Sequence, residues 1–362
     1  MEPGTRAKRA RTMDIAGLIR PNILTLEPYH SAREKIQEGV LLDANENPYS
    51  QEWQGIGLNR YPDPYQRKLR KAIARYLGVQ RDNVVAGVGS DEIFDWIFKV
   101  FCQPGKDRIA IAEPTYGMYQ VTAKIFGIPC FEFGFDEGFS LSAERFLKRV
   151  PSDAKVLFLC SPNNPTGNLL DREQILQIAQ KWQKIVVVDE AYIEFADQPS
   201  LVSDLNEVPN VILLRTLSKA FGQAGMRLGY AVTSPQIVAY FLKVKAPYNM
   251  NVLTMNRGCQ VLGQVESHLA CVSEIRKERD RVAAQLRGIP QIERVFPSQA
   301  NFLLFRCPQA SLVCQRLLGK NILVRDRSSL RDLENCIRVS IGTSSENDLF
   351  LNELQGIVKG ML

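Results

Sequence analysis

Polar side chains of complementary chemistry follow three consecutive apolar runs in the middle of the chain. They are an amide, a carboxylate, a phenol, a lysine and an arginine: Asn164, Asp189, Tyr192, Lys219 and Arg227. A lysine amine can hold an aldehyde as an imine, and a carboxylate can keep a heterocyclic nitrogen protonated. Each group also has an ordinary explanation as a turn, a helix cap or a solvated side chain. Because all five occur together in this order, we interpret them as one site.

The apolar runs before these groups predict buried strands. Together with two earlier runs they cover Val84–Val88, Arg108–Ala112, Val156–Cys160, Ile185–Val188 and Val211–Leu214. Continuous apolar runs separated by helices are typical of parallel strands covered on both faces. An amphipathic helix over Arg172–Lys184 fits the crossover between two of them. We therefore expect an α/β domain with a mostly parallel sheet, which binds ligands at the carboxyl ends of its strands.

The strand predicted at Val84–Val88 leads into a candidate anion site. Gly87–Asp91 opens a helix whose first turn is acidic, and we expect Ser90 to cap this helix. Free N–H groups and the helix dipole at such a start can hold a phosphate. The loop lacks the Gly-Lys-Ser/Thr of a P-loop and the third glycine of a dinucleotide fingerprint. Alone, it does not distinguish a phosphate site from an ordinary capped turn.

The last hundred residues predict a smaller α+β domain. A long charged helix is expected over 264–286, with strands at 301–305, 322–324 and 336–341 and helices near 310–318 and 346–359. The predicted organisation is a basic flexible tail at 1–13, a segment at 14–49 that contributes to the small domain, a large ligand-binding domain at 50–250 and the small domain at 251–362.

Composition narrows the class of protein. The 362 residues carry a net charge of +6, half of it in residues 1–13, and we expect this tail to be passive rather than a nucleic-acid contact. Neither a membrane span nor a signal peptide is expected. Eight cysteines without a CxxC pair fit reduced thiols in a cytoplasmic protein. The two histidines, His30 and His268, cannot build a His-rich zinc site, so no metal is expected and the proton carrier is not expected to be histidine.

One cofactor needs the whole set of groups described above. Pyridoxal 5'-phosphate requires a lysine for its aldehyde, an aspartate for its ring nitrogen, donors for its phenolic oxygen and an anion site for its phosphate. Once the substrate amine displaces the lysine, that lysine is free to carry the proton. The shortage of histidine is consistent with such a mechanism.

Several segments resemble the fold-type I pyridoxal-phosphate aminotransferases, and within them the histidinol-phosphate aminotransferase family. The segments that carry the resemblance are 42–48, 60–64, 87–92, 113–119, 161–167, 189–192, 218–227, 246–248 and 300–302. The similarity extends over nearly the whole chain from about residue 15. It implies a seven-stranded, mostly parallel sheet with a small α+β domain, and a homodimer with shared active sites.

The resemblance implies a role for each site residue. Lys219 would hold the cofactor as an imine and shuttle the proton, Asp189 would pair with the ring nitrogen, and Tyr116 would stack on the ring. Asn164 and Tyr192 would bind the phenolic oxygen. The cofactor phosphate would be held by Ser218, Arg227, the amides of Ser90 and Asp91, and Tyr61 of the neighbouring subunit.

Substrate selection is expected to depend on Arg338 and Arg325, with Tyr29 and Asn47 from the N-terminal segment. Arg338 resembles the arginine that holds the substrate carboxylate in this fold. Two arginines with a phenol suit a phosphate dianion better than a carboxylate. Arg325 could instead form a surface ion pair with Asp326.

The implied reaction is transamination between L-histidinol phosphate and 2-oxoglutarate, giving imidazole acetol phosphate and glutamate, in histidine biosynthesis. An aromatic-amino-acid aminotransferase or a threonine-phosphate decarboxylase of the same fold is the alternative. A cofactor-sensing regulator would need a DNA-binding module, for which 13 tail residues are too few. A Ser-x-x-Lys hydrolase is disfavoured because Thr216 occupies the serine position.

Overall fold

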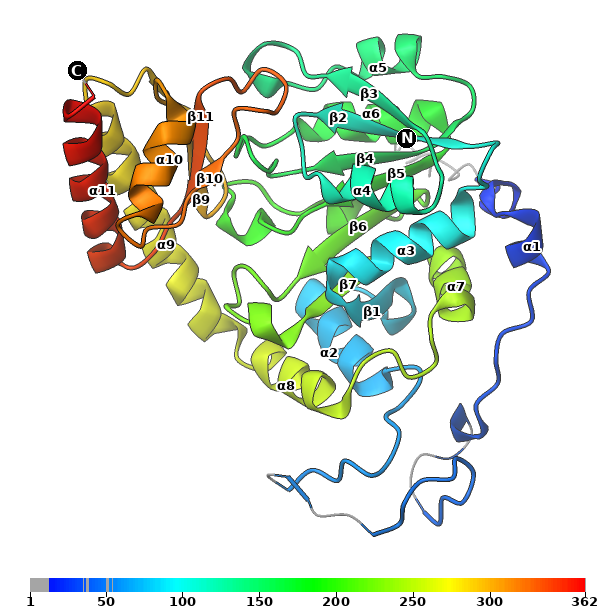
Figure 1. Cartoon of the computed structure of the whole chain (residues 1–362). Coiled ribbons are helices and arrows are strands. Elements are labelled where there is room, and N and C mark those ends of the chain that lie inside the picture. The colour runs from blue at the N-terminus through cyan, green and yellow to red at the C-terminus, as the bar shows by residue number, and fades with distance from the viewer. Residues whose placement is uncertain (1–12, 35, 37–38, 50–51, 54, 362) are drawn as a thin grey trace, which may run out of the picture.

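A seven-stranded sheet forms the centre of the larger of two bodies (Figure 1). The computed structural model describes residues 13–34, 36, 39–49, 52–53 and 55–361, so nearly all of the predicted basic tail lies outside the described residues. The strands are β1 (Val84–Val88), β2 (Arg108–Glu113), β3 (Cys130–Gly134), β4 (Ala154–Cys160), β5 (Ile185–Asp189), β6 (Val211–Thr216) and β7 (Leu228–Val232).

The strand order β1-β7-β6-β5-β4-β2-β3 confirms the predicted fold class. β7 is antiparallel to both neighbours, and every other pairing is parallel. Two strands were not expected from the sequence. β3 is an edge strand with only two of its five residues buried, and Gly229 interrupts the apolar pattern of β7.

Successive residues of the central strands face two different cores, which explains their continuous apolar runs. In β4, Leu157 and Leu159 pack in one core, whereas Val156 and Phe158 pack in the other. α2 (Arg67–Leu77), α5 (Ala143–Arg149), α6 (Arg172–Trp182) and α8 (Val252–Leu262) cover the first core. α1 (Pro21–Leu24), α3 (Gly89–Phe101), α4 (Met118–Ile125) and α7 (Pro235–Val244) cover the second.

The start of α3 differs from the prediction that Ser90 caps it. The helix begins at Gly89, with Val88 at the N-cap position, so Ser90 lies within the first turn. No described side chain caps this start, and the Glu92 carboxylate instead accepts from the N–H of Val88 itself at 2.6 Å. The Ser90 amide remains free for another partner.

The small body is a four-stranded antiparallel sheet in the order β10-β11-β9-β8 with three helices against it (Figure 1). Its elements are α9 (Val265–Arg287), β8 (Arg294–Val295), β9 (Phe302–Arg306), α10 (Ala310–Leu318), β10 (Arg325–Asp326), β11 (Cys336–Ser340) and α11 (Ser344–Lys359). The strand predicted at 322–324 is wrong: the buried Val324 side chain packs in the core, and ladder pairing begins at Arg325.

Packing divides the chain at places other than those expected. Within α9, Val272 packs in a core of the large body and Leu286 in that of the small body, so the division falls inside this helix rather than at residue 251. Ile15, Ile19 and Ile23 present one apolar face to the second core of the large body. The sequence predicted that 14–49 contributes to the small domain, but this part of the segment packs on the large body. In the part of the chain that the structure describes, no helix has the length and apolar character needed to span a membrane.

Candidate active site

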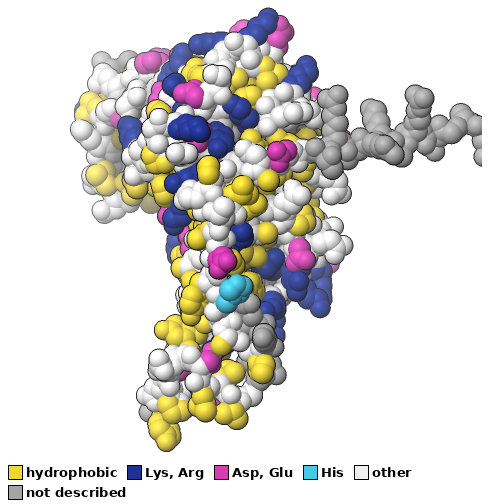
Figure 2. Space-filling model, turned by 90° about the vertical axis from the view of Figure 1, so that its right-hand side faces the viewer, with side chains coloured by type: hydrophobic (Ala, Val, Ile, Leu, Met, Phe, Trp, Pro, Cys, Tyr) yellow, Lys and Arg dark blue, Asp and Glu magenta, His cyan; other side chains and the backbone are white. Residues whose placement is uncertain are grey.

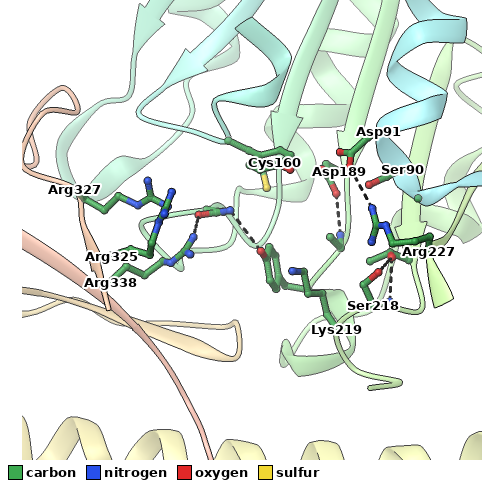
Figure 3. A pocket seen from close by; sticks show the side chains of 16 residues that line it. Ser90, Asp91, Cys160, Asp189, Ser218, Lys219, Arg227, Arg325, Arg327 and Arg338 are labelled. Atoms are coloured by element: carbon green, nitrogen blue, oxygen red, sulfur yellow. Dashed lines mark hydrogen bonds and ion pairs between the residues drawn. The ribbon is translucent and has the colours of Figure 1, made fainter. Parts of the chain in front are cut away.

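A cavity of about 310 Å³ lies at the carboxyl ends of β4, β5 and β6, facing the small body. It is lined by eleven residues that the sequence singled out: Ser90, Asp91, Tyr116, Asn164, Asp189, Tyr192, Ser218, Lys219, Arg227, Arg325 and Arg338. Figure 3 shows Arg325 and Arg338 at one end and Ser218 and Arg227 at the other. The amine of Lys219 lies between the two ends.

Asp189, the last residue of β5, presents a buried carboxyl group with two fixed donors. The Tyr119 hydroxyl donates to Oδ2 at 2.8 Å, and the Ala191 N–H donates to Oδ1 at 3.0 Å. Burial raises the pKa of Asp189 to about 6, and the two hydrogen bonds limit that rise. A carboxylate held in this way is a suitable partner for a protonated ring nitrogen.

Lys219 lies three residues beyond the end of β6, in a loop held by its own hydrogen bonds. The Ser218 N–H donates to Oγ1 of Thr216 at 3.0 Å, and the Lys219 carbonyl accepts from the Gly222 N–H at 3.1 Å. Burial lowers the pKa of Lys219, and the positive charge of Arg338 lowers it further. More of the amine is therefore neutral and nucleophilic near neutral pH than for an exposed lysine.

Three side chains link the small body to the large one across the cavity. Arg338 of β11 donates through Nη1 to Oδ1 of Asn164 at 2.5 Å, and Nδ2 of Asn164 donates to the Tyr192 hydroxyl at 3.4 Å (Figure 3). The Tyr192 ring packs edge-on against Phe302 of β9, with centroids 5.2 Å apart. The amide of Asn164 therefore connects a ligand bound at Arg338 with a ligand bound at Tyr192.

The other end of the cavity is an anion cradle built from backbone. The N–H groups of Ser90 and Asp91 lie in the first turn of α3 and donate to no described residue. Arg227 places Nη2 3.4 Å from Oδ2 of Asp91, and its carbonyl accepts from the Gly89 N–H at 2.7 Å. Gly229 lies directly against this turn, because a Cβ there would come within 2.2 Å of the Ser90 nitrogen. Free amides, a helix start and a guanidinium suit a phosphate.

Tyr116 forms an aromatic wall of the cavity in the turn before α4. Its ring meets that of Tyr119 edge-on at 5.5 Å, and Tyr119 stacks on Phe158 at 4.9 Å. Burial raises the pKa of Tyr116 to about 12, so its phenol stays neutral at physiological pH. The wall is therefore a flat, uncharged surface suited to a planar ring.

Sequence reasoning missed four residues of the site, namely Tyr119, Cys160, Thr216 and Arg327. Two carried a usable signal. Arg327 follows Arg325 by two residues, which places both on one face of a strand, and Tyr119 follows Tyr116 at helical spacing. Cys160 and Thr216 are the last residues of strands and line the cavity for that reason alone.

Three predicted site residues, Tyr29, Asn47 and Tyr61, do not line the cavity. They belong to the arm, meaning the described residues between 25 and 66, which runs away from the large body (Figure 1). The Tyr61 ring stacks on Tyr248 at 4.5 Å, and its carbonyl accepts from Nη1 of Arg33 at 2.9 Å. The Tyr29 side chain is 70% exposed. The direction of the arm keeps all three out of this chain's own cavity.

Comparison with known proteins identifies the family. The model of aminotransferase classes I and II matches residues 24–354. A histidinol-phosphate aminotransferase of Parabacteroides distasonis is 43% identical over 346 residues, which cover 95% of this chain and 99% of that protein. The chain belongs to the histidinol-phosphate aminotransferase family.

Solved structures of this family share the fold. The histidinol-phosphate aminotransferase of Clostridium acetobutylicum superposes with a TM-score of 0.77 at 28% identity, covering 84% of this chain and 92% of that one. The enzyme of Sinorhizobium meliloti, solved in complex with pyridoxal-5'-phosphate, has a TM-score of 0.77 at 25% identity and covers 84% of both chains. The resemblance drawn from the motifs is thereby confirmed, and with it an aminotransferase of fold type I.

Proposed function

We infer that this chain transfers an amino group between L-histidinol phosphate and 2-oxoglutarate, giving imidazole acetol phosphate and glutamate, with pyridoxal 5'-phosphate as cofactor. This reaction is a step of histidine biosynthesis. Family membership supports it. The main structural support is the cavity itself, which has a cationic subsite at each end and Lys219 with Asp189 in its middle part. A phosphorylated cofactor and an anionic substrate together need two such subsites.

The residues around the cavity fit the cofactor. The free amides of Ser90 and Asp91 with Ser218 and Arg227 would hold its phosphate, and Asp189 would bind its ring nitrogen. Asn164 and Tyr192 would donate to its phenolic oxygen, and Tyr116 would cover one face of its ring. When bound, the cofactor supplies an electron sink that acidifies the α carbon of the amine substrate.

The chain's own residues then position the substrate and move the proton. Arg338 and Arg325 bind the substrate anion, which fixes the α carbon above Lys219. Nζ of Lys219 would be the base that takes the proton from that carbon and the acid that gives it back. The lowered pKa of Lys219 makes the neutral amine available as a base. We assign Tyr29 and Asn47 to the substrate site only through a partner chain, because neither residue lines this chain's own cavity.

Replacing Gly229 by alanine tests the cradle directly. The new Cβ would overlap backbone atoms, 2.2 Å from the Ser90 nitrogen and 2.4 Å from the Gly89 carbon, so the turn must shift. We expect a stability loss of about 1–3 kcal/mol and a roughly tenfold or larger rise in the dissociation constant of pyridoxal phosphate. Thermal melts and an absorbance titration measure the two effects. Gly225→Ala is the matched control, because its Cβ would meet nothing within 4 Å, and equal behaviour of the two variants would contradict the cradle.

The choice of substrate is tested by single half-reactions of the cofactor-loaded protein. The visible absorbance of the bound cofactor is expected to change faster with histidinol phosphate than with phenylalanine or threonine phosphate. The aromatic aminotransferase would reverse the first comparison. Release of carbon dioxide from threonine phosphate would identify the decarboxylase and overturn the assignment.

The arm supports a homodimer with shared active sites. Apolar side chains such as Val40, Leu42 and Tyr49 are more than 80% exposed there, and Figure 2 shows yellow side chains on this downward projection. Tyr61 contacts Tyr248 through its ring and Arg33 through its carbonyl, and it does not line its own cavity. A partner's cavity is therefore the place where it could bind a cofactor phosphate. Light scattering is expected to give twice the 40.8 kDa of one chain, and a monomer would contradict the proposal.

A cytoplasmic location is consistent with the state of the cysteines. All eight are free thiols, and four of them are buried. Disulfides are rare in a reducing cytoplasm and common outside it. Fractionation of cells that produce the protein would test this location, and recovery from a membrane or secreted fraction would contradict it.

A further inference from the structure

Three arginines project from one face of the small sheet into the cavity. Arg325 and Arg338 are direct partners across β10 and β11. The Arg327 N–H donates to the Cys336 carbonyl at 2.8 Å, which continues this ladder. Residues two apart in a strand share a face, so Arg327 joins Arg325 and Arg338. Figure 3 shows the three side chains side by side at the end of the cavity away from Arg227.

No described carboxylate forms an ion pair with any of these three arginines. The nearest acid in sequence, Asp326, accepts from the Ser311 hydroxyl at 2.5 Å and from the Ser328 N–H at 2.8 Å. The surface ion pair between Arg325 and Asp326, considered from the sequence, is therefore not formed. Nε of Arg327 and Nε of Arg338 are buried without a hydrogen-bond partner.

An arginine cluster of this kind destabilises the folded protein while no anion is bound to it. Like charges directly opposite each other on two strands are destabilising. Burial lowers the pKa of Arg327 to about 10, with further contributions from the charges of Arg338 and Arg325. Buried donors without partners carry an additional desolvation cost. An anion that meets all three guanidinium groups removes both costs at once.

We propose that Arg327 is a specificity-determining residue that makes this subsite prefer a phosphate dianion to a carboxylate. The proposal rests on the proposed function, in which the subsite receives a phosphate from one substrate and a carboxylate from the other. One planar guanidinium satisfies the two oxygens of a carboxylate. A phosphate dianion offers three oxygens and about twice the charge, so it can also engage Arg327. The third arginine therefore contributes mainly to the phosphorylated substrate.

Half-reactions of the cofactor-loaded protein measure this preference. In Arg327→Gln, the apparent dissociation constant of histidinol phosphate is expected to rise about 10- to 100-fold, because a charge-assisted hydrogen bond to the phosphate is lost. That of glutamate is expected to change less than about threefold. Arg327→Lys keeps the positive charge without the planar guanidinium. Its dissociation constant for histidinol phosphate is expected to lie between those of the wild type and Arg327→Gln. Arg331→Gln is the control, since Arg331 lies on the same loop, is largely exposed and does not line the cavity.

A binding measurement with inorganic phosphate separates recognition from turnover. Inorganic phosphate is expected to inhibit the glutamate half-reaction of the wild type competitively and that of Arg327→Gln at least about tenfold more weakly. Without phosphate, Arg327→Gln is expected to melt no lower than the wild type, because it relieves repulsion between like charges. Inorganic phosphate loses its dianionic form as the pH falls below about 7. Phosphate inhibition of the wild type is therefore expected to weaken below that pH, and less so in the variant.

The outcomes distinguish this proposal from the proposed function. Equal losses for histidinol phosphate and glutamate, unchanged phosphate inhibition or a lower melting temperature of Arg327→Gln would overturn the role of Arg327. Weakened phosphate inhibition with no wild-type reaction toward histidinol phosphate would support Arg327 and overturn the choice of substrate. Loss of selectivity in Arg331→Gln as well would show a general charge effect and would also overturn the proposal.

Discussion

Lys219→Ala is expected to lower the turnover of histidinol phosphate by about 10⁴-fold, the upper end of what one positioned acid–base group contributes. The variant loses the amine that we propose attaches the cofactor, which belongs to the only described lysine side chain that lines the cavity. We expect the purified variant to lack the visible band of the covalently bound cofactor. Borohydride reduction followed by peptide mapping is expected to label the peptide with Lys219 in the wild type and no peptide in the variant.

The matched control for this experiment is Lys148→Ala. Lys148 is a lysine of the same body whose side chain is 72% exposed and forms a surface pair with Glu144. Its loss is expected to leave turnover and labelling unchanged, since exposed pairs contribute little. A reducible covalent label elsewhere in Lys219→Ala would contradict the assignment of this lysine.

Asp189→Asn is expected to lower kcat by about 10² to 10³-fold, the range for removing one preorganised electrostatic group from an active site. The amide keeps the size of the carboxyl group and can still accept from the Tyr119 hydroxyl, so the fold is expected to survive. What is lost is the negative charge that we propose pairs with the ring nitrogen of the cofactor. Steady-state kinetics at saturating cofactor measure the effect, with Asp153→Asn, a partly exposed partner of Arg108, as control.

The raised pKa of Asp189 also predicts a pH dependence. Without cofactor, the native state holds a proton on Asp189 below about pH 6, whereas the unfolded chain holds it only below about 3.8. The penalty that this group places on stability at neutral pH therefore decreases progressively as the pH falls from about 6 to about 3.8. In the proposed site the cofactor binds the ionised carboxylate of Asp189. The affinity for the cofactor is therefore expected to fall by up to about tenfold per pH unit below pH 6. Titrations near pH 5 and pH 7 are expected to show this loss in the wild type and not in Asp189→Asn.

Much of the large body could be predicted because its strands are buried on both faces. The runs at 156–160 and 185–188 are apolar throughout because both faces are buried. The predicted bounds of these strands therefore agree with the observed ones to within two residues. β3 and β7 were missed because an edge strand is only partly buried and because Gly229 serves the neighbouring turn rather than the core. The strand at 322–324 was misplaced because apolar residues mark packing, whereas strands are defined by backbone pairing.

The site was predicted where chemistry requires a particular residue type. Lys219, Asp189 and Arg227 belong to motifs of that kind, and the structure brings them to one cavity. Tyr119 was missed because its hydroxyl acts through Asp189, at a sequence separation of 70 residues. The position of Tyr61 could not be predicted either, because the direction of the arm depends on contacts between segments and not on local sequence.

The shared amide of Asn164 connects Arg338 at one end of the cavity with the Tyr192 hydroxyl in its middle part. Its Oδ1 is engaged by Arg338 and its Nδ2 by Tyr192, so a change at either neighbour alters what the amide offers to the other. Linkage requires that such coupling be reciprocal. Any factor by which an anion on Arg338 changes retention of the cofactor is also the factor by which the cofactor changes affinity for that anion. With the proposed contact between Tyr192 and the cofactor, we expect the affinity for the cofactor to depend on whether an anion occupies Arg338.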